Sequence, residues 1–164
     1  MPRVELSIKI QSPIETVFDL ARSIDLHTES TAQTNEVAVA GVTSGLIELG
    51  ESVTWEATHF FVKQQLTAKI VAFDRPNHFR DSMVQGIFKH FDHDHFFEAT
   101  PTGTVMRDVF EYSSPFGVIG QIANFLLVDR HMRKLLVERN KVIKRIAESN
   151  ETQTYLNPAA QQID

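Results

Sequence analysis

Hydrophobic and polar positions alternate at the start of the chain, over residues 3 to 10. Apolar side chains stand at every second position from Val4 to Ile10, and this period of two predicts a half-buried β-strand. The alternation stops at Ser12-Pro13-Ile14-Glu15, where a serine, a proline and a following glutamate are typical of a helix N-terminus. We therefore expect Ser12 to cap a short helix, and a second short helix is expected over about residues 24 to 30.

Six further strands are predicted between residues 35 and 113. Segments with strand character are separated there by turns rich in glycine, proline and asparagine. The expected strands are residues 36–42, 51–61, 63–73, 79–87, 89–99 and 104–113. Because no segment with a helical period lies between them to make parallel crossovers, an antiparallel meander is expected.

The period becomes helical from Ile119, and apolar residues then recur at steps of three and four up to about Glu148. A helix of roughly thirty residues is about 45 Å long, which is enough to cross a sheet. The prediction is an α+β helix-grip fold in one domain over residues 1–149. A curved seven-stranded antiparallel sheet wraps around the long C-terminal helix, with two short helices after the first strand. Residues 150–164 lack a period and apolar mass, and a mobile tail is expected there.

Composition narrows the classes of function. Among 164 residues, 16 basic and 21 acidic side chains give a net charge of −5, which disfavours binding to nucleic acid or an anionic membrane. The absence of cysteine excludes disulfides, thiolate metal sites and cysteine nucleophiles. No segment approaches the roughly 18 apolar residues of a membrane span, and the N-terminus lacks the apolar core of a signal peptide. A cytoplasmic monomer or homodimer is expected.

Several short motifs accompany this order of elements between residues 3 and 148. They are SP at 12–13 with ETVF at 15–18, VTWEATHF at 53–60, FRD and GIF at 79–88, FDHDHFF at 91–97, and MRDVFEY before SPFG at 106–117. Together they resemble the helix-grip superfamily of START domains, polyketide cyclases and the major birch-pollen allergen, in particular a bacterial branch of ligand-binding or cyclase-like proteins. The resemblance implies the fold, but it does not choose among transport, sensing, cyclisation and binding.

The strand at 89–99 carries the most distinctive polar pattern. Strand parity places His93 and His95 on one face, between Phe91 and Phe97, and we expect this face to line a cavity under the long helix. On the next strand, Asp108 shares a face with apolar residues. A few polar groups among hydrophobic walls are typical of a small-molecule site. The residues expected to bind ligand are Trp55, His59, Leu66, Met83, Phe91, His93, His95, Phe97, Met106, Asp108, Phe110, Tyr112, Ile122 and Leu126.

Three interpretations of His93, His95 and Asp108 compete. They can hydrogen-bond one another and orient a ligand. One histidine can act as a general base oriented by Asp108. They can also bind a metal, but Asp108 would have to reach in as the third ligand, so no metal and no cofactor is expected. The favoured function is binding of a small, largely hydrophobic molecule. The alternatives are a cyclase- or hydratase-like enzyme and a partner-binding protein with no small ligand.

Overall fold

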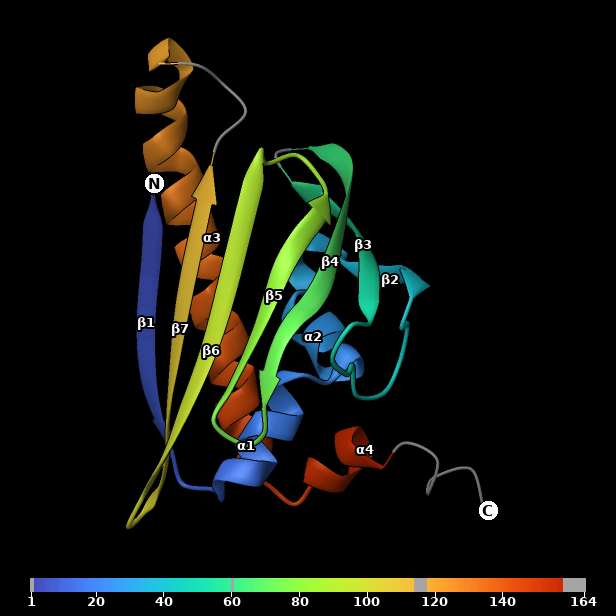
Figure 1. The fold of residues 1–164 in the computed structure, drawn as a ribbon, viewed down its shortest axis with the longest axis vertical. Helices are drawn as coiled ribbons and strands as arrows, with labels where there is room; N and C mark the ends of the chain where they lie inside the picture. Colours follow the sequence, from blue (N-terminus) through green and yellow to red (C-terminus); the bar gives the residue numbers. More distant parts are fainter. Residues whose placement is uncertain (1, 60, 114–117, 158–164) are drawn as a thin grey trace.

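The computed structural model describes residues 2–59, 61–113 and 118–157, without the side chains of residues 59 and 118–126. Seven strands form one antiparallel sheet in the order β1-β7-β6-β5-β4-β3-β2 (Figure 1). The strands are β1 (Arg3–Ile10), β2 (Val37–Gly41), β3 (Ser52–His59), β4 (Val62–Asp74), β5 (His78–Gln85), β6 (His90–Thr100) and β7 (Gly103–Ser113). Each agrees with its expected range to within two residues, and the predicted antiparallel helix-grip fold is confirmed.

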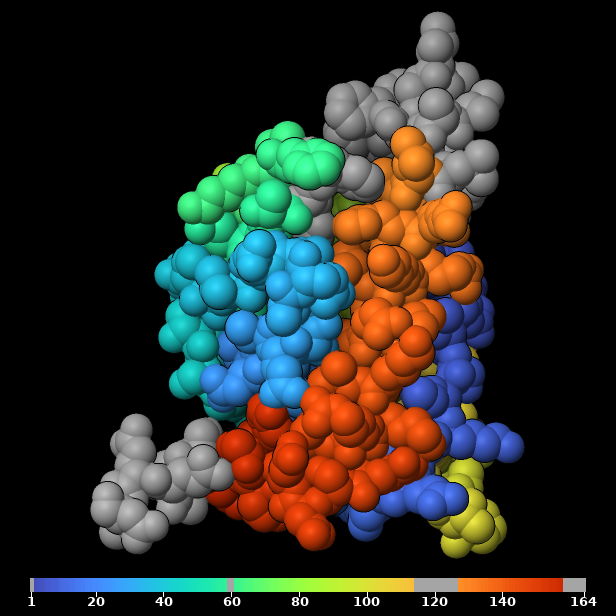
Figure 2. All heavy atoms as spheres, turned by 180° about the vertical axis from the view of Figure 1, so that it is seen from behind, coloured from blue at the N-terminus to red at the C-terminus, as the bar shows by residue number. Residues whose placement is uncertain are grey.

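The helices cover one face of this sheet. They are α1 (Ile14–Ala21), α2 (Ile24–Ser30), a 3-10 turn η1 (Ala32–Thr34), the long α3 (Val118–Ala147) and the short α4 (Thr152–Leu156). Figure 1 shows α3 crossing behind β1, β7 and β6, and α2 behind the other half of the sheet. Seen from that side in Figure 2, the α2 region lies directly against α3. The two helices therefore close the sheet's inner face together.

The start of α1 differs from the expectation. The helix begins at Ile14 with Pro13 as its N-cap, and no side chain caps it, so the prediction that Ser12 is the cap was wrong. Ser12 is buried and acts through its carbonyl oxygen, which accepts a 2.8 Å hydrogen bond from the Thr104 hydroxyl. A side-chain cap occurs instead on α2, where Ser23 Oγ accepts from the backbone N–H of Leu26 at 3.3 Å.

Two hydrophobic clusters fill the space between sheet and helices. The first is centred on Phe18 of α1, whose ring meets Phe73, Phe79 and Phe97 edge-on at centroid distances of 5.2 to 5.4 Å. The second lies around Phe110 and includes Leu136 of α3. Because β4 carries two register shifts, next to Ala68 and near Ile70, the sheet bends between the clusters.

The hairpin between β6 and β7 depends on a glycine. Gly103 has φ +146°, and a Cβ atom there would overlap the carbonyl oxygen of Ile10. The hairpin therefore packs against the end of β1 at a distance that only glycine permits.

The segment after α3 contains a short helix. Residues 152–156 form α4, whose Tyr155 and Leu156 pack against the first cluster, and the Tyr155 hydroxyl hydrogen-bonds Glu29. The interpretation of residues 150–164 as a mobile tail stays a prediction, and residues 158–164 lie outside the described residues.

Deleting residues 151–164 is expected to lower the Tm by roughly 2 to 4 °C. The deletion exposes part of the first cluster and removes about 1 kcal/mol of packing and hydrogen bonding. Differential scanning calorimetry of the deletion and of a shorter one, residues 158–164, measures this. If both deletions leave the Tm unchanged, α4 contributes nothing to stability.

Candidate functional site

A cavity of about 170 Å³ lies between the sheet and the helices. Most of its lining is apolar, contributed by β3 to β7 on one side and by α2 and α3 on the other. Six residues of the predicted site line it: Trp55, Leu66, Phe91, His93, His95 and Phe110. The strand parity predicted for His93 and His95 is thus the one that the structure has.

Other residues of the predicted site lie behind this lining. Phe97 and Met106 belong to the first cluster, and Tyr112 and Met83 pack in the second. Asp108 is completely buried beneath the two histidines. The side chains of His59, Ile122 and Leu126 lie outside the described residues.

A second cavity of about 80 Å³ adjoins the first. The two share Glu36, Trp55, Leu66, Phe88 and Met132 in their linings. His131 of α3 also lines this second cavity. The pair of cavities therefore runs along Trp55, between β3 and α3.

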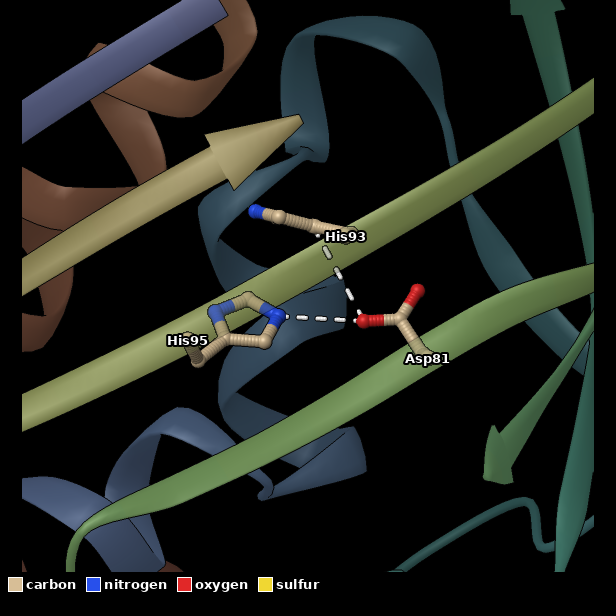
Figure 3. Close-up of side chains that lie close together, drawn as sticks. All are labelled: Asp81, His93 and His95. Atoms are coloured by element: carbon tan, nitrogen blue, oxygen red, sulfur yellow. Dashed lines mark hydrogen bonds and ion pairs between the residues drawn. The ribbon is translucent and has the colours of Figure 1, made fainter. Parts of the chain in front are cut away.

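Asp81 of β5 joins the two histidines in the larger cavity (Figure 3). Its Oδ1 lies 3.0 Å from Nε2 of His95 and 3.8 Å from Nδ1 of His93. The strand register explains the meeting, because Asp81 stands directly opposite His93. The sequence-based site did not include Asp81. Met83 was assigned to the cavity face, and Asp81 shares that face because it lies two residues away on the same strand.

Asp108 of β7 holds the histidines from the other side. Its Oδ1 lies 2.7 Å from Nδ1 of His95 and 3.3 Å from Nε2 of His93, although the second approach lacks hydrogen-bond geometry. Asn140 donates to the other oxygen, and Nη1 of Arg139 lies 3.7 Å from Oδ1. Both of these α3 residues are buried and were absent from the sequence-based site.

These contacts set the charge states of the group. Burial would raise the pKa of Asp108, but the two histidines hold this pKa well below its usual value. Burial would likewise raise the pKa of Asp81, and the hydrogen bond with His95 keeps it lowered. Both carboxylates are therefore ionised at neutral pH.

The two histidines shift in opposite directions. Burial, helped by repulsion from His95, lowers the pKa of His93. Burial would lower the pKa of His95 too, but hydrogen bonds to Asp108 and Asp81 outweigh it and raise this pKa. One neutral and one more basic imidazole thus lie side by side, with ring centroids 3.9 Å apart.

A second polar group lies beside Trp55. Nε2 of His27 is 2.7 Å from Oε1 of Glu36, and the His27 ring stacks on the indole with centroids 4.2 Å apart. All three residues line the larger cavity. These two polar groups lie in a lining that is mainly apolar, as in small-molecule sites.

The outer face of β6 carries charged residues, and part of this face is buried. Asp94 is buried and accepts hydrogen bonds from Arg80 at 2.7 and 2.8 Å and from His78 at 2.7 Å. Burial would raise the pKa of Asp94, but these partners lower it. The outer face thus carries an ion-pair network across β5 and β6, away from the cavity.

Comparison with solved structures places the fold among known proteins. The protein TTHA0849 from Thermus thermophilus superposes with a TM-score of 0.69 at 19% identity, covering 90% of this chain and 100% of its own. Ara h 8.0201 gives 0.62 at 16% identity, with 91% and 99% coverage. A major latex-like protein from Panax ginseng gives 0.64 at 13% identity, with 90% and 98% coverage.

The chain has the helix-grip fold of these structural neighbours across about nine tenths of its length, which is the fold that the motifs implied. No protein-family model matches the chain, and no curated protein sequence matches it. Within the described residues, no helix is long and apolar enough to cross a membrane.

Proposed function

We propose that the protein binds a small, largely hydrophobic molecule in the cavity between the sheet and α3. The observation that carries this proposal is the 170 Å³ cavity itself, which has apolar walls and polar groups at only a few positions. A well-packed interior leaves few voids larger than a water molecule, so a space of this size indicates a binding site. The helix-grip resemblance implies a cavity of the same kind.

The dimensions restrict the ligand. An apolar cavity of about 150 Å³ accommodates a molecule the size of benzene, so the larger cavity fits a single ring or a short branched chain. An extended ligand would reach along Trp55 into the second cavity. Its polar end would meet Asp81, His93 and His95, or the pair of His27 and Glu36.

A catalytic alternative uses the same cavity. Asp81 lines the cavity, and its Oδ1 lies 3.0 Å from Nε2 of His95, whose Nδ1 is 2.7 Å from Asp108. A carboxylate held in this way can take a proton from, or return it to, a bound carbonyl compound. This geometry favours a cyclase- or hydratase-like reaction as the second candidate. The cytoplasmic location and the monomeric or homodimeric state stay predictions.

Binding of 4-nitrophenol is expected to quench the emission of Trp55, the only tryptophan of the chain. The probe has one ring that fits the cavity, and its nitro group quenches indole fluorescence on contact. Replacing Ala68, which is buried and lines the cavity, with Phe should weaken the affinity at least tenfold because the new ring occupies the ligand's space. A fluorescence titration at constant ionic strength measures both affinities.

Val71→Phe is the matched control, since Val71 belongs to the same strand but is 49% exposed. It should leave the affinity within about twofold. Equal affinities for both variants would place the probe outside the cavity. No quenching of the wild-type protein, together with native mass spectra that show no co-purified small molecule, would favour a partner-binding protein with no small ligand.

A further inference from the structure

Three potential ligand atoms meet at the polar end of the cavity. They are Oδ1 of Asp81, a ring nitrogen of His93 and a ring nitrogen of His95, all within 4.8 Å of one another. Ligands bound at about 2.1 Å to one ion lie roughly 3.0 to 4.2 Å apart. The distances from Asp81 to the two histidines, 3.0 and 3.8 Å, already fall in this range. The three atoms therefore lie at or near the spacing of ligands that share one ion.

The two ring nitrogens of His95 face different carboxylates. Its Nδ1 lies 2.7 Å from Oδ1 of Asp108, and its Nε2 lies 3.0 Å from Oδ1 of Asp81. An imidazole that donates its Nδ1–H to Asp108 is held with Nε2 directed at Asp81. A positive centre between Nε2 and Oδ1 of Asp81 stabilises this arrangement. That centre is either a second proton on His95 or a metal ion.

The surroundings match those of metal-binding histidines. A histidine that binds a metal through one nitrogen usually donates the other N–H to a carboxylate, which fixes the ring and increases its basicity. Asp108 occupies this position for His95 and closely approaches Nε2 of His93. It is in turn fixed by Asn140. This outer support is fully buried and is built from β7 and α3, away from the cavity.

Charge and access also fit a divalent ion. Asp81 and Asp108 contribute two negative charges, and Arg139 is the cationic side chain beside Asp108. Asp81 keeps 21% of its side-chain surface exposed, and it lines the cavity together with both histidines. An ion at this point would therefore have open coordination positions on the cavity side.

We propose that Asp81, His93 and His95 bind a divalent transition-metal ion at the polar end of the cavity. Two imidazoles and one carboxylate suit Zn²⁺, Fe²⁺ or Co²⁺ and do not suit Ca²⁺ or Mg²⁺, which need more oxygen ligands. The sequence predicted no metal because Asp108 was the only third ligand considered. Asp81 supplies that third ligand, and Asp108 supports the histidines from behind. The inference does not depend on the hydrophobic ligand proposed above.

Zinc titration of the full chain tests the site, after dialysis against EDTA and then against metal-free buffer. Isothermal titration calorimetry should show one Zn²⁺ per chain. A hundredfold excess over the Kd should raise the Tm by roughly 5 to 10 °C. Co²⁺ should give visible absorption bands of a site with nitrogen and oxygen ligands. Asp81→Asn and His93→Ala should each weaken Zn²⁺ binding by roughly tenfold or more, and both changes lie at the cavity surface, where folding is least affected.

The control pair is His90 and Asp92, on the other face of β6. Nε2 of His90 lies 3.2 Å from Oδ2 of Asp92, so a surface pair of the same residue types is present in the same strand. His90→Ala and Asp92→Asn should leave Zn²⁺ affinity and the Tm increase unchanged. The proposal is overturned if the folded wild-type protein binds no Zn²⁺, because the positive centre is then a proton on His95. It is also overturned if the control variants lose binding while Asp81→Asn and His93→Ala retain it.

Discussion

Asp108→Ala is expected to lower the free energy of unfolding by about 3 to 5 kcal/mol, measured in EDTA by urea denaturation with circular dichroism. The carboxylate has no exposed surface and is the shared partner of His95, Asn140 and Arg139. Removing it leaves buried donors and positive charge without compensation, and such losses are among the largest that single substitutions produce. Folding lowers the pKa of Asp108, so the ionised carboxylate stabilises the folded protein at every pH above the ordinary aspartate pKa. This stabilisation is lost as the pH falls through the lowered pKa.

Two further variants make this result specific. Asp108→Asn keeps the shape of the side chain and one acceptor oxygen. Its loss of unfolding free energy should therefore be smaller than that of Asp108→Ala. Asp92→Ala removes a carboxylate from the outer face of the neighbouring strand and should cost about 1 kcal/mol or less. Equal losses for Asp92→Ala and Asp108→Ala would show that the buried network has no special energetic role.

Phe18→Ala should also destabilise the protein by about 3 to 5 kcal/mol. The ring is fully buried and makes edge-on contacts with Phe73, Phe79 and Phe97. Its loss leaves a cavity between α1 and the sheet, because strands and helix cannot move together to fill it. The change in the urea midpoint at constant slope measures the effect.

Phe96→Ala is the control for residue type. Phe96 lies on the outer face of β6, stacked on His78 at 4.7 Å and beside the Arg107 guanidinium at 4.4 Å. Its replacement should cost about 1 kcal/mol, chiefly from the lost cation–π and stacking contacts. A cost as large as that of Phe18→Ala would mean that the outer face contributes as much to stability as the core does.

Much of the fold follows from periodicity because one face of nearly every element is buried. The first strand comes from a period of two residues, and the change to helix near residue 118 comes from a period of three to four. The first residue of α1 could not be derived from periodicity, because a serine–proline pair permits either residue to be the N-cap. In the structure Pro13 is the N-cap, and the Ser12 carbonyl oxygen accepts a hydrogen bond from the Thr104 hydroxyl.

The site was harder to derive because its residues come together only through pairing across strands. Parity alone placed His93 and His95 on the cavity face, and the structure has them there. The meeting of His93 with Asp81 depends on the register between β5 and β6, which alternation within one strand does not specify. Arg139 and Asn140 are polar residues on a helix face expected to be apolar. Their burial is explained by partners on other elements, Asp108 for Asn140 and the Ala21 carbonyl oxygen for Arg139.

The pairing of β1 with β7 has a consequence for synthesis on the ribosome. Val4 pairs with Phe110, so roughly a hundred more residues must be synthesised before β1 can pair with β7. At about 5 to 20 residues per second, this delay is roughly 5 to 20 s. During it, the apolar stripe from Val4 to Ile10 is exposed beside the emerging chain. The charged residues alternating with that stripe, Arg3, Glu5 and Lys9, oppose edge-to-edge association of nascent chains in this interval.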